Sequence, residues 1–380
     1  MPGYPGLILL AFSVASLIYL LLAVYAILKF NPEARIEVSQ TPPITIFKPL
    51  CGLDYMLYEN LKSFCQQTYP NFQIVFGMAD KNDPAIEVVR RLQKEFPDTD
   101  IELVINNRVT GTNLKICNLA NMYPKAKYDL LAIADSDMHV ENDYLNRIAS
   151  CFDDESVGAA TCLYSATPAG GLASKLGAMF INEWFLPSVL VALTFQKLDF
   201  CFGATMVVRR HVLEEIGGFD RLKSLLADDH MLGKLVNKMG YNVILISCLV
   251  ENLVHEPDFV TLYRHELRWA RTIRLVQPAG YSLSFITYAI PLSLFLIVFW
   301  PTCHAGYVMV TCAIILRLVI HSMLRSRLKL KNTSFQMWLV PVRDCLNFII
   351  WVASFFSRKV SWRQKDFAIR SNGSLRNIEK

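Results

Sequence analysis

The fold is decided by residues 130–137, which read Leu130-Leu131-Ala132-Ile133-Ala134-Asp135-Ser136-Asp137. Five consecutive apolar residues are typical of a buried β-strand, and the polar residues that follow end it. The two carboxylates therefore lie at the carboxyl end of a strand. Oxygen ligands at this spacing can share one divalent cation, one directly and one through water. An acidic turn that caps the next helix would explain the same residues without a metal.

Similar apolar runs precede this strand, and amphipathic segments separate them. We expect further strands at 44–50, 73–79 and 101–105, and helices at 54–67, 84–96, 113–122 and 143–152. This βαβα order predicts an α/β fold with a mostly parallel sheet that helices cover on both faces. Ligands of such sheets bind beyond the carboxyl ends of the strands. Neither GxGxxG nor GxxxxGK[ST] occurs, so a dinucleotide-binding fold or a P-loop kinase is not supported.

Three more polar residues are candidates for ligand contacts at this edge of the sheet. Asp80 and Asp83 follow the strand at 73–79 and could hold the base and ribose of a nucleotide. Asp83 before Pro84 also suits the start of a helix, and both roles can hold together. Lys115 follows Gly-Thr-Asn and could pair with a phosphate, or it is a solvated surface lysine.

A second acidic pair, Asp228-Asp229, precedes an amphipathic helix expected at 231–239. Acidic residues at a helix start interact favourably with the helix dipole, which is a sufficient structural reason for them. The functional interpretation is that one of them accepts a hydroxyl proton as a general base. Its acidic neighbour would raise its pKa towards that role.

Two long apolar stretches predict membrane helices. The first, at 7–28, is long enough to cross a bilayer, and residues 1–28 hold no charged side chain. It is too long for a signal peptide and lacks a basic start, so we expect a retained helix. The second, at 275–316, contains no Asp, Glu, Lys or Arg and predicts a hairpin of helices near 282–301 and 305–324.

A third apolar segment, at 335–356, contains Arg343 and Asp344. An interfacial or re-entrant segment would keep these two charged residues near water. The alternative is a spanning helix with Arg343 and Asp344 paired in its interior.

The charges of the chain are distributed unevenly. The net charge of +5 divides into −8 for residues 1–263 and +13 for residues 264–380. Basic residues flank the membrane segments, including Lys29 and Arg35, those at 264–274 and those at 325–331. By the positive-inside rule, these flanks place residues 31–275 in the cytoplasm of an integral membrane protein. No motif supports a nucleic-acid partner.

Composition limits the remaining classes of protein. Hydrophobic residues make up 53% and charged residues 19%, which excludes a disordered chain. The ten cysteines form no CxxC pair, so neither a zinc site nor a thioredoxin-like motif is supported. Their dispersion fits small core residues in a reducing compartment.

The motifs combine with His265-Glu266-Leu267-Arg268-Trp269 into a pattern that resembles a known family. The ordered set of Asp83, Asp135-Ser136-Asp137, Asp229 and Arg268-Trp269 is similar to the D, DxD, D, (Q/R)xxRW signature of inverting family 2-like glycosyltransferases. More closely, the chain resembles the ceramide glucosyltransferase family, family 21, with FKPLCGLD at 47–54 as further support. The segment HELRWARTIR resembles the bacterial branch that includes hopanoid glucosaminyltransferases.

The resemblance implies a GT-A fold, which is Rossmann-like with a mostly parallel sheet, and a role for each matching residue. Asp83 would contact the nucleotide, and Asp135 would support the metal and the diphosphate. Asp135 and Asp137 would hold a divalent metal, Mg or Mn. Asp229 would be the catalytic base, with Arg268 and Trp269 completing the donor and acceptor site. His265 departs from the signature, which has Gln or Arg there.

The implied reaction moves glucose or N-acetylglucosamine from a UDP-sugar to the hydroxyl of a membrane lipid, with inversion. The acceptor is ceramide-like or a hopanoid polyol, and the enzyme sits in the cell membrane if it is bacterial. The expected organisation has four parts: a transmembrane helix at 1–30, a GT-A domain at 31–275, a hairpin at 276–330, and an interfacial or re-entrant segment with a basic tail at 331–380.

Two alternatives stay open at this point. A processive polysaccharide synthase carries the same signature, but it needs a translocation pore built from more membrane helices. A non-catalytic membrane lipid-binding or scaffold protein would use the acidic residues only as helix caps. Substitution of Asp229 and Asp137 distinguishes the second alternative, because a scaffold has no sugar transfer to lose.

Overall fold

The computed structural model describes residues 4–32, 40–330 and 337–357 with their side chains, and the backbone of three C-terminal strands. These strands are β9 (Lys359–Trp362), β10 (Lys365–Ile369) and β11 (Leu375–Asn377), and β10 pairs antiparallel with β11. Arg35, Lys331 and the first two residues of the segment at 335–356 lie outside the described residues.

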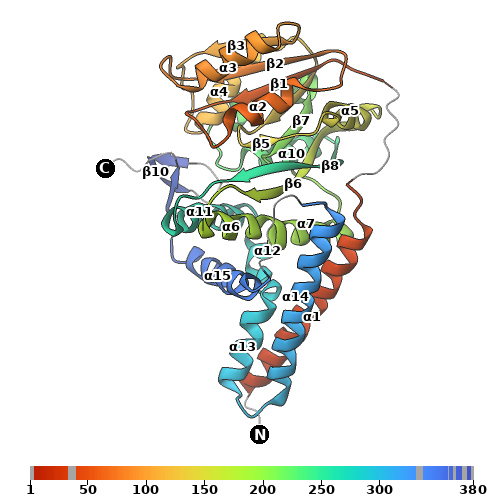
Figure 1. Cartoon of the computed structure of the whole chain (residues 1–380), viewed down its shortest axis with the longest axis vertical. Helices are drawn as coiled ribbons and strands as arrows, with labels where there is room; N and C mark the ends of the chain where they lie inside the picture. Colours follow the sequence, from red (N-terminus) through yellow and green to blue (C-terminus); the bar gives the residue numbers. More distant parts are fainter. Residues whose placement is uncertain are drawn as a thin grey trace. The chain divides into compact units, whose positions relative to one another are not determined.

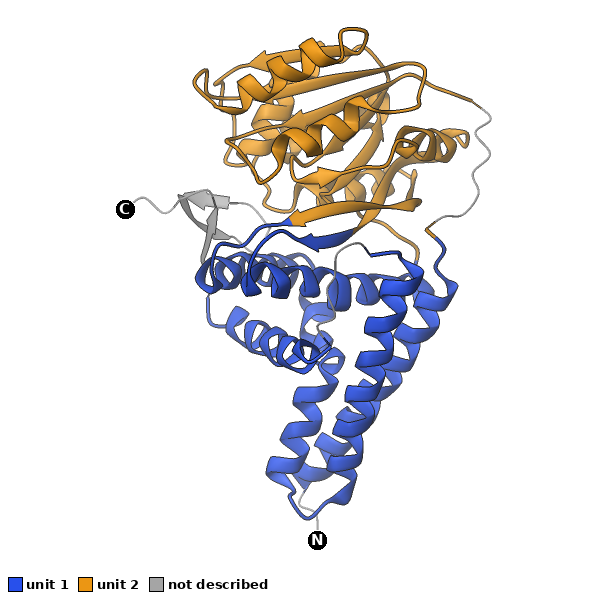
Figure 2. Cartoon of the chain, in the orientation of Figure 1, with its two compact units in different colours: residues 1–31, 165–196, 254–365 blue, residues 32–164, 197–253, 366–380 orange. Residues whose placement is uncertain are grey.

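Contacts divide the chain into two compact units (Figure 2). Unit 1 comprises residues 1–31, 165–196 and 254–365. Unit 2 comprises residues 32–164, 197–253 and 366–380. Each unit therefore collects segments that are distant in the sequence.

The main sheet has eight strands in the order β3-β2-β1-β4-β7-β6-β8-β5 (Figure 1). Strands β1 to β4 are mutually parallel where they pair, and β7 continues the sheet antiparallel to β4. The strands are β1 (Ile44–Pro49), β2 (Phe72–Met78), β3 (Asp100–Ile105), β4 (Leu130–Ala134), β5 (Met138–His139), β6 (Val157–Pro168), β7 (Thr205–Arg209) and β8 (Asn242–Val254). Residues 165–168 and 254 belong to unit 1, and the rest of the sheet belongs to unit 2.

Helices cover both faces of the parallel strands, as the continuous burial of β1 and β4 requires. Ile44 and Ile46 of β1 pack in one core with residues of α2 (Leu57–Cys65), α3 (Ala85–Glu95) and α5 (Tyr144–Ala149). Phe47 points to the other face, where its ring lies 6.4 Å from Phe219 of α9 (Gly218–Leu222). On that face α4 (Leu114–Met122) packs against β1 and β2, and α8 (Arg210–Glu215) and α10 (Asp228–Lys238) complete the unit. The strands and helices expected between 44 and 152 are confirmed, with bounds shifted by a few residues.

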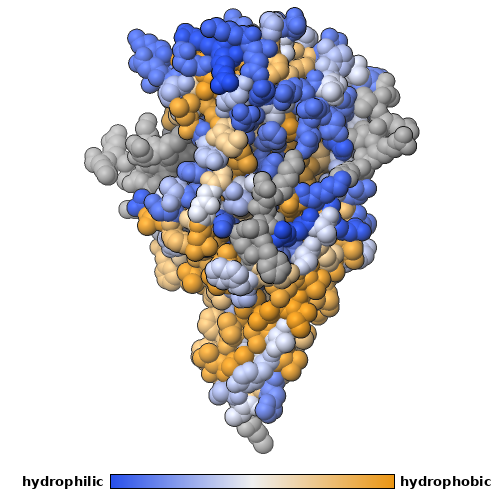
Figure 3. Space-filling model, viewed as in Figure 1, coloured by the Kyte–Doolittle hydropathy of each residue, from blue (hydrophilic) through white to orange (hydrophobic). Residues whose placement is uncertain are grey.

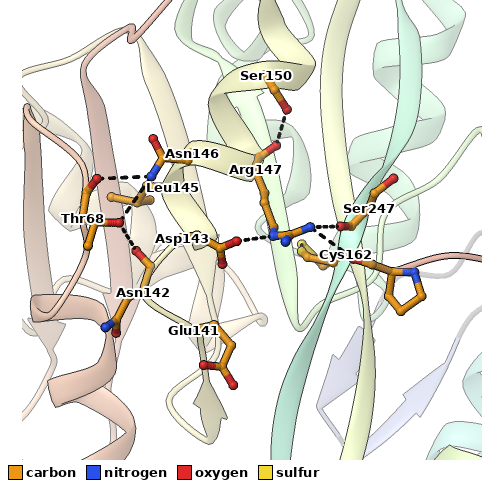
Figure 4. Close-up of polar contacts among 12 residues, drawn as sticks. Thr68, Glu141, Asn142, Asp143, Leu145, Asn146, Arg147, Ser150, Cys162 and Ser247 are labelled. Atoms are coloured by element: carbon orange, nitrogen blue, oxygen red, sulfur yellow. Dashed lines mark hydrogen bonds and ion pairs between the residues drawn. The ribbon is translucent and has the colours of Figure 1, made fainter. Parts of the chain in front are cut away.

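Helix α5 is tied to β8 by one arginine (Figure 4). Arg147 donates to Oδ2 of Asp143 at 2.7 Å and to the carbonyl of Ser247 at 2.7 Å. Asn146 on the same helix donates to the carbonyl of Thr68. The bond to Ser247 thus joins α5, which follows the acidic turn at 135–137, to β8, and the bond from Asn146 joins α5 to the loop after α2.

Unit 1 is built from long helices whose apolar side chains face outward. Helices α1 (Tyr4–Lys29), α13 (Ala289–Phe299) and α14 (His304–Arg327) pack against one another, and Figure 3 shows hydrophobic residues over them. Among the described residues, α1 and α14 are long and apolar enough to cross a membrane, with 22% and 28% of their apolar windows buried. Exposed apolar helices of this length indicate membrane association.

A third helix of sufficient length, residues 172–195, was not expected from the sequence. It consists of α6 (Leu172–Met179), a π-helix (Phe180–Phe185) and α7 (Leu186–Phe195). Its apolar window is 61% buried, so packing inside unit 1 accounts for much of its apolar character.

The first half of the expected hairpin is broken rather than continuous. We expected one helix near 282–301, but α12 (Pro278–Leu283) and a 3-10 turn (Ser284–Thr287) meet α13 at an angle of 67°. Pro291 is the third residue of α13 and lies in its first turn. A proline is tolerated there because the N–H groups of the first turn have no partner within the helix.

Two buried ion pairs hold α11 (Phe259–Val276), α14 and α15 (Leu339–Ser354) together. Arg343 donates to both carboxylate oxygens of Glu266, at 2.9 and 2.5 Å. Arg317 donates to both oxygens of Asp344, at 3.0 and 2.6 Å. The expectation that Arg343 and Asp344 lie near water is therefore wrong, since they are 0% and 2% exposed. Neither pairs with the other, because Glu266 and Arg317 provide their opposite charges.

Removing one partner of the α11–α15 pair is expected to destabilise unit 1. Arg343→Met leaves the Glu266 carboxylate buried without its counter-charge, which costs about 3–5 kcal/mol in comparable sites. The double variant Arg343→Met/Glu266→Leu removes both charges and should recover most of that loss. Thermal unfolding of the detergent-solubilised chain measures the difference, with exposed Arg264→Met on α11 as the control. Equal unfolding temperatures for the single and double variants would contradict this role.

Candidate active site

The acidic turn at 135–137 follows β4 directly, at the carboxyl edge of the parallel strands. Because β1 pairs in parallel with both β2 and β4, the residues after these three strands meet at this edge. Asp80 and Asp83 follow β2, and Lys48 lies near the end of β1. The structure therefore brings the acidic turn and the residues after β2 to one edge of unit 2.

Lys115 is the central cation of this edge. Its Nζ lies 2.6 Å from Oδ1 of Asp135 and 3.8 Å from Oδ2 of Asp228. Burial alone would lower the pKa of Lys115, but Asp135 and Asp228 outweigh burial and raise it. Lys115 is thus a charged group locked between two carboxylates, and the surface-lysine interpretation is wrong, since its side chain is only 17% exposed.

Asp137 is held by the neighbouring part of β8. Asn252 donates to its Oδ2 at 2.8 Å. Burial, reinforced by the negative charge of Asp135, raises the pKa of Asp137 to about 6. Its carboxylate therefore lies in a place where an additional positive charge would be stabilising.

Asp229 is the second residue of α10 and is fixed by the backbone. The N–H of His230 donates to its Oδ1 at 2.7 Å. Burial, followed by the repulsion of Asp228, raises the pKa of Asp229 to about 6. Asp228 and Asp229 also occupy the first turn of α10, where the helix dipole favours acidic residues. This part of the structural explanation is therefore confirmed.

A glycine separates the carboxylates of Asp135 and Asp229. A Cβ placed on Gly203 would lie 3.3 Å from Oδ2 of Asp229 and 3.6 Å from Oδ2 of Asp135. The two oxygens thus face the same small space above the backbone of residue 203. Any side chain at this position would fill it.

The donor set fits a hard divalent cation. Asp135 and Asp137 supply carboxylate oxygens, and no cluster of three or more His, Cys, Asp or Glu ligands occurs in the described part of the chain. Mg²⁺ is commonly bound by one or two carboxylates, with water and substrate phosphates completing its shell. Asp135 and Asp137 are therefore the residues that would hold such a cation.

Asp83 and Asp80 have different local roles. Both oxygens of Asp83 accept backbone N–H groups, one from Ala85 at 2.9 Å and one from Gly52 at 2.8 Å. Asp83 therefore fixes the start of α3 and the loop after β1. Asp80 is exposed, and its Oδ1 accepts the N–H of Asn82 in a tight turn.

Lys48 is one of the polar residues at the carboxyl ends of the strands, where the sequence predicts ligand contacts, but the sequence alone assigns it no role. Its Nζ donates to the backbone carbonyl of Asp135 at 2.5 Å and lies 3.7 Å from the ring centroid of Phe64. Burial lowers the pKa of Lys48 to about 7, against the opposing effect of Asp135. A lysine inside the apolar run ITIFKPL was the available signal, since a fully buried lysine needs a partner.

Asn113 was also missed as a connection between two parts of the site. Its Oδ1 accepts the N–H of Ile116 and so caps α4. Its Nδ2 donates to the carbonyl of Leu225 at 2.8 Å and to Oδ1 of Asp228 at 3.0 Å. Asn113 thereby links the helix that carries Lys115 to the start of α10.

Arg268 and Trp269 lie on α11 in unit 1. The indole of Trp269 stacks on Phe180 of the π-helix at 5.7 Å and contacts the ring of His265 at 4.1 Å. Nδ1 of His265 lies 2.7 Å from Oε1 of Glu256. The unexpected histidine therefore has a defined place, between a buried carboxylate and the tryptophan of the motif.

Sequence comparison relates the chain to glycosyltransferases. The model of glycosyl transferase family 21 matches residues 8–375. Ceramide glucosyltransferase 3 of Caenorhabditis elegans is 28% identical over 235 residues, which are 61% of this chain and 50% of that protein. Ceramide glucosyltransferase of Komagataella phaffii is 34% identical over 124 residues, 31% of this chain and 24% of that protein. The chain thus spans half or less of the length of these relatives.

Structural comparison supports the fold. The mannosyltransferase PcManGT from Pyrobaculum calidifontis, solved in complex with GDP-Man and Mn²⁺, aligns with a TM-score of 0.50 and 18% identity. The alignment covers 90% of this chain and 99% of that chain. At this identity the likeness bears on the fold alone, and it confirms the expected α/β, GT-A-like architecture.

Loss of the Asn113 side chain is expected to loosen the site locally. Asn113→Ala removes a helix cap, worth about 1 kcal/mol, and leaves a buried carboxylate oxygen of Asp228 without its donor. Amide hydrogen exchange of peptides from α4 and the start of α10 should accelerate at least fivefold. Asn106→Ala, an exposed asparagine after β3, is the control and should leave exchange of these helices unchanged. Unchanged exchange in Asn113→Ala would show that the link is not structural.

Proposed function

The chain belongs to glycosyl transferase family 21, and on this premise we propose that it transfers a hexose from a UDP-sugar to the hydroxyl of a membrane lipid, with inversion. The observation that carries this proposal is the space over Gly203, which the carboxylates of Asp135 and Asp229 share. One carboxylate is paired with Lys115, and the other has a raised pKa. Lys115 beside Asp135 provides a cation for the leaving phosphate, and Asp229 provides a base for the attacking hydroxyl.

In the proposed reaction, the oxygen of the lipid hydroxyl attacks the anomeric carbon of the sugar. Asp229 accepts the proton of that hydroxyl. The bond between that carbon and the diphosphate oxygen breaks, and its electron pair leaves with UDP. A carboxyl with a pKa of about 6 is ionised at neutral pH and still basic enough to take the proton. Nucleophile and leaving group lie on opposite faces of the sugar, which produces inversion.

The remaining residues are proposed to hold the donor. Lys115 is placed by α4 and Asn113 and contacts the diphosphate, which Asp135 would support through a bound cation. Asp135 and Asp137 would hold a divalent cation, Mg or Mn, which would neutralise the charge of the diphosphate. Asp80 and Asp83 contact the nucleoside from the end of β2. Arg268 and Trp269 complete the donor and acceptor site, with Trp269 oriented by His265 and Phe180.

Two donor and acceptor pairs are consistent with the sequence: glucose with ceramide, and N-acetylglucosamine with a hopanoid polyol. The relatives are named as ceramide glucosyltransferases, which favours the first, and the segment HELRWARTIR resembles the bacterial hopanoid branch, which favours the second. Membranes that contain either lipid, offered both UDP-sugars, distinguish them when the product is identified by mass spectrometry.

We also propose the arrangement in the membrane. Residues 1–30 and 276–330 anchor the protein in the bilayer, residues 331–380 lie at its surface or re-enter it, and residues 31–275 face the cytoplasm. The basic residues that end α1 and α14 support this orientation. A lipid hydroxyl stays at the bilayer surface, so this arrangement brings the acceptor within reach of a transferase.

Substitution of the base tests the proposal. Asp229→Asn retains the size of the side chain but cannot accept a proton, so transfer should fall about 10²–10⁴-fold. Binding of UDP to the same variant should change little, because the diphosphate contacts remain. Asp220→Asn changes an exposed carboxylate of α9 and serves as the control. Wild-type transfer should also stop in EDTA. Full activity of Asp229→Asn, or full activity in EDTA, would overturn the assigned mechanism.

The raised pKa of Asp229 predicts the acid limb of the pH profile. Its carboxyl is protonated below about pH 6 and then cannot accept the hydroxyl proton. We expect kcat/KM to fall about tenfold per pH unit below that value and to level off above it. Steady-state rates between pH 4.5 and 8 measure this limb. A limb centred near pH 4, the range of an unperturbed aspartate, would contradict the proposed role.

A further inference from the structure

The loop between β1 and α2, residues 50–56, contacts two parts of the candidate site that follow different strands. We call it the β1–α2 loop. The N–H of Gly52 donates to Oδ2 of Asp83 at 2.8 Å, and the hydroxyl of Ser136 donates to Oδ2 of Asp54 at 2.5 Å. One bond therefore reaches the segment after β2, and the other reaches the acidic turn after β4. The proposed reaction gives no role to Gly52, Asp54 or Ser136.

The position of the β1–α2 loop in the sheet explains why it can contact both segments. Strands β2 and β4 are not neighbours, because β1 lies between them and pairs in parallel with each. Two strand spacings, about 10 Å, therefore separate the ends of β2 and β4. The loop continues β1 at the same edge of the sheet, so it starts between the two segments that it joins.

The bond to Asp83 depends on the backbone conformation of Gly52. Its φ is +76°, in the left-handed region that favours glycine. A Cβ placed on Gly52 would have no atom within 4 Å, so the conformation and not a lack of space favours glycine here. The other carboxylate oxygen of Asp83 accepts the N–H of Ala85 at 2.9 Å. Asp83 is thus held between the loop and the start of α3.

The bond to Ser136 reaches the middle of the acidic turn. Asp135 and Asp137 are the residues of this turn that would hold a cation, and the side chain between them is neutral. Its hydroxyl is occupied by Asp54 of the loop. Lys48 of β1 donates to the carbonyl of Asp135 as well. The end of β1 and the loop after it therefore position two consecutive residues of the turn.

A ligand that contacts both segments needs them at a fixed separation. The nucleoside and the diphosphate of a sugar donor are joined covalently, so their distance from each other is limited. In the proposed function, Asp83 contacts the nucleoside and the acidic turn supports the diphosphate through a cation. Both contacts form together only if the protein presents them at the separation that the ligand has. Holding them there before binding reduces the cost of ordering them.

We propose that the β1–α2 loop sets the distance between the nucleoside contact and the diphosphate contact. Gly52, Asp54 and Ser136 are the positioning residues, and none of them needs to touch the donor. This inference rests on the proposed function, because it takes a nucleoside diphosphate as the ligand of this edge of the sheet. It adds that the site discriminates in favour of a ligand that contains both parts over either part alone.

Binding of a whole ligand and of its parts tests this role. Ser136→Ala and Asp54→Ala remove the same bond, and each should weaken binding of UDP with Mn²⁺ about tenfold. Binding of uridine alone, or of pyrophosphate with Mn²⁺, should change less than twofold, because neither spans both contacts. The double variant should bind UDP no more weakly than the single variants, and Ser136→Thr, which retains the hydroxyl, should bind like the wild type. Isothermal titration of the full chain in detergent measures these affinities.

A glycine substitution tests the other end of the loop without removing a polar group. Gly52→Ala should weaken UDP at least fivefold through its backbone conformation. Gly240→Ala is the matched control, because Gly240 also has a positive φ, +95°, and open space around its Cβ position. It lies just beyond the far end of α10 and should leave UDP binding unchanged. In steady-state transfer, Gly52→Ala and Ser136→Ala should raise KM for the donor and leave kcat within twofold, since Asp229 is unaffected.

Three results would overturn the inference. Unchanged UDP binding in both Ser136→Ala and Gly52→Ala would show that the loop does not position the contacts. Equal weakening of UDP, uridine and pyrophosphate would show a general loosening of the site instead of a change in separation. A wild-type chain that binds no UDP would overturn the proposed function and this inference with it, whereas the first two results would leave the proposed function standing.

Discussion

The candidate active site depends on the ion pair between Lys115 and Asp135. Four carboxyl groups, those of Asp135, Asp137, Asp228 and Asp229, are gathered in the part of unit 2 where β4, α4 and α10 begin or end. Burial, reinforced by their mutual repulsion, raises the pKa of three of them, Asp137, Asp228 and Asp229. Lys115, whose Nζ lies 2.6 Å from Asp135, provides a compensating charge. Without it, the folded state would have to protonate the carboxyl groups that the proposed chemistry needs ionised.

Polar groups from distant parts of the chain position the residues of this ion pair and its neighbours. Asn113 connects the start of α4 to Asp228, and Lys48 connects β1 to the carbonyl of Asp135. A methyl group on residue 203 would occupy the space that the carboxylates share. In unit 1 the same principle applies on a larger scale, since Glu266 and Asp344 are each held by an arginine from another helix. Buried charge is tolerated in both units only where a partner is supplied.

The sequence predicted the elements better than the connections between them. Strand β4 and its two aspartates were recognisable because an apolar run that ends in carboxylates is a local pattern. The roles of Lys48 and Asn113 were not, because each depends on a partner at least 87 residues away in the chain. Arg343 and Asp344 were expected near water for the same reason. Nothing adjacent to them in sequence indicates Glu266 or Arg317, and only the folded arrangement of α11, α14 and α15 provides these partners.

The central claim is that this edge of the sheet carries out a single displacement on a UDP-sugar with a lipid as the acceptor. The anomeric configuration of the product is the most direct measurement of it. The purified chain, Mn²⁺, an isotopically labelled UDP-hexose and the acceptor lipid are incubated, and the product is analysed by NMR spectroscopy. Single displacement on the α-linked donor should give a lipid that carries one β-linked hexose. An α-linked product would contradict the single displacement, and a polymer would contradict transfer to a lipid.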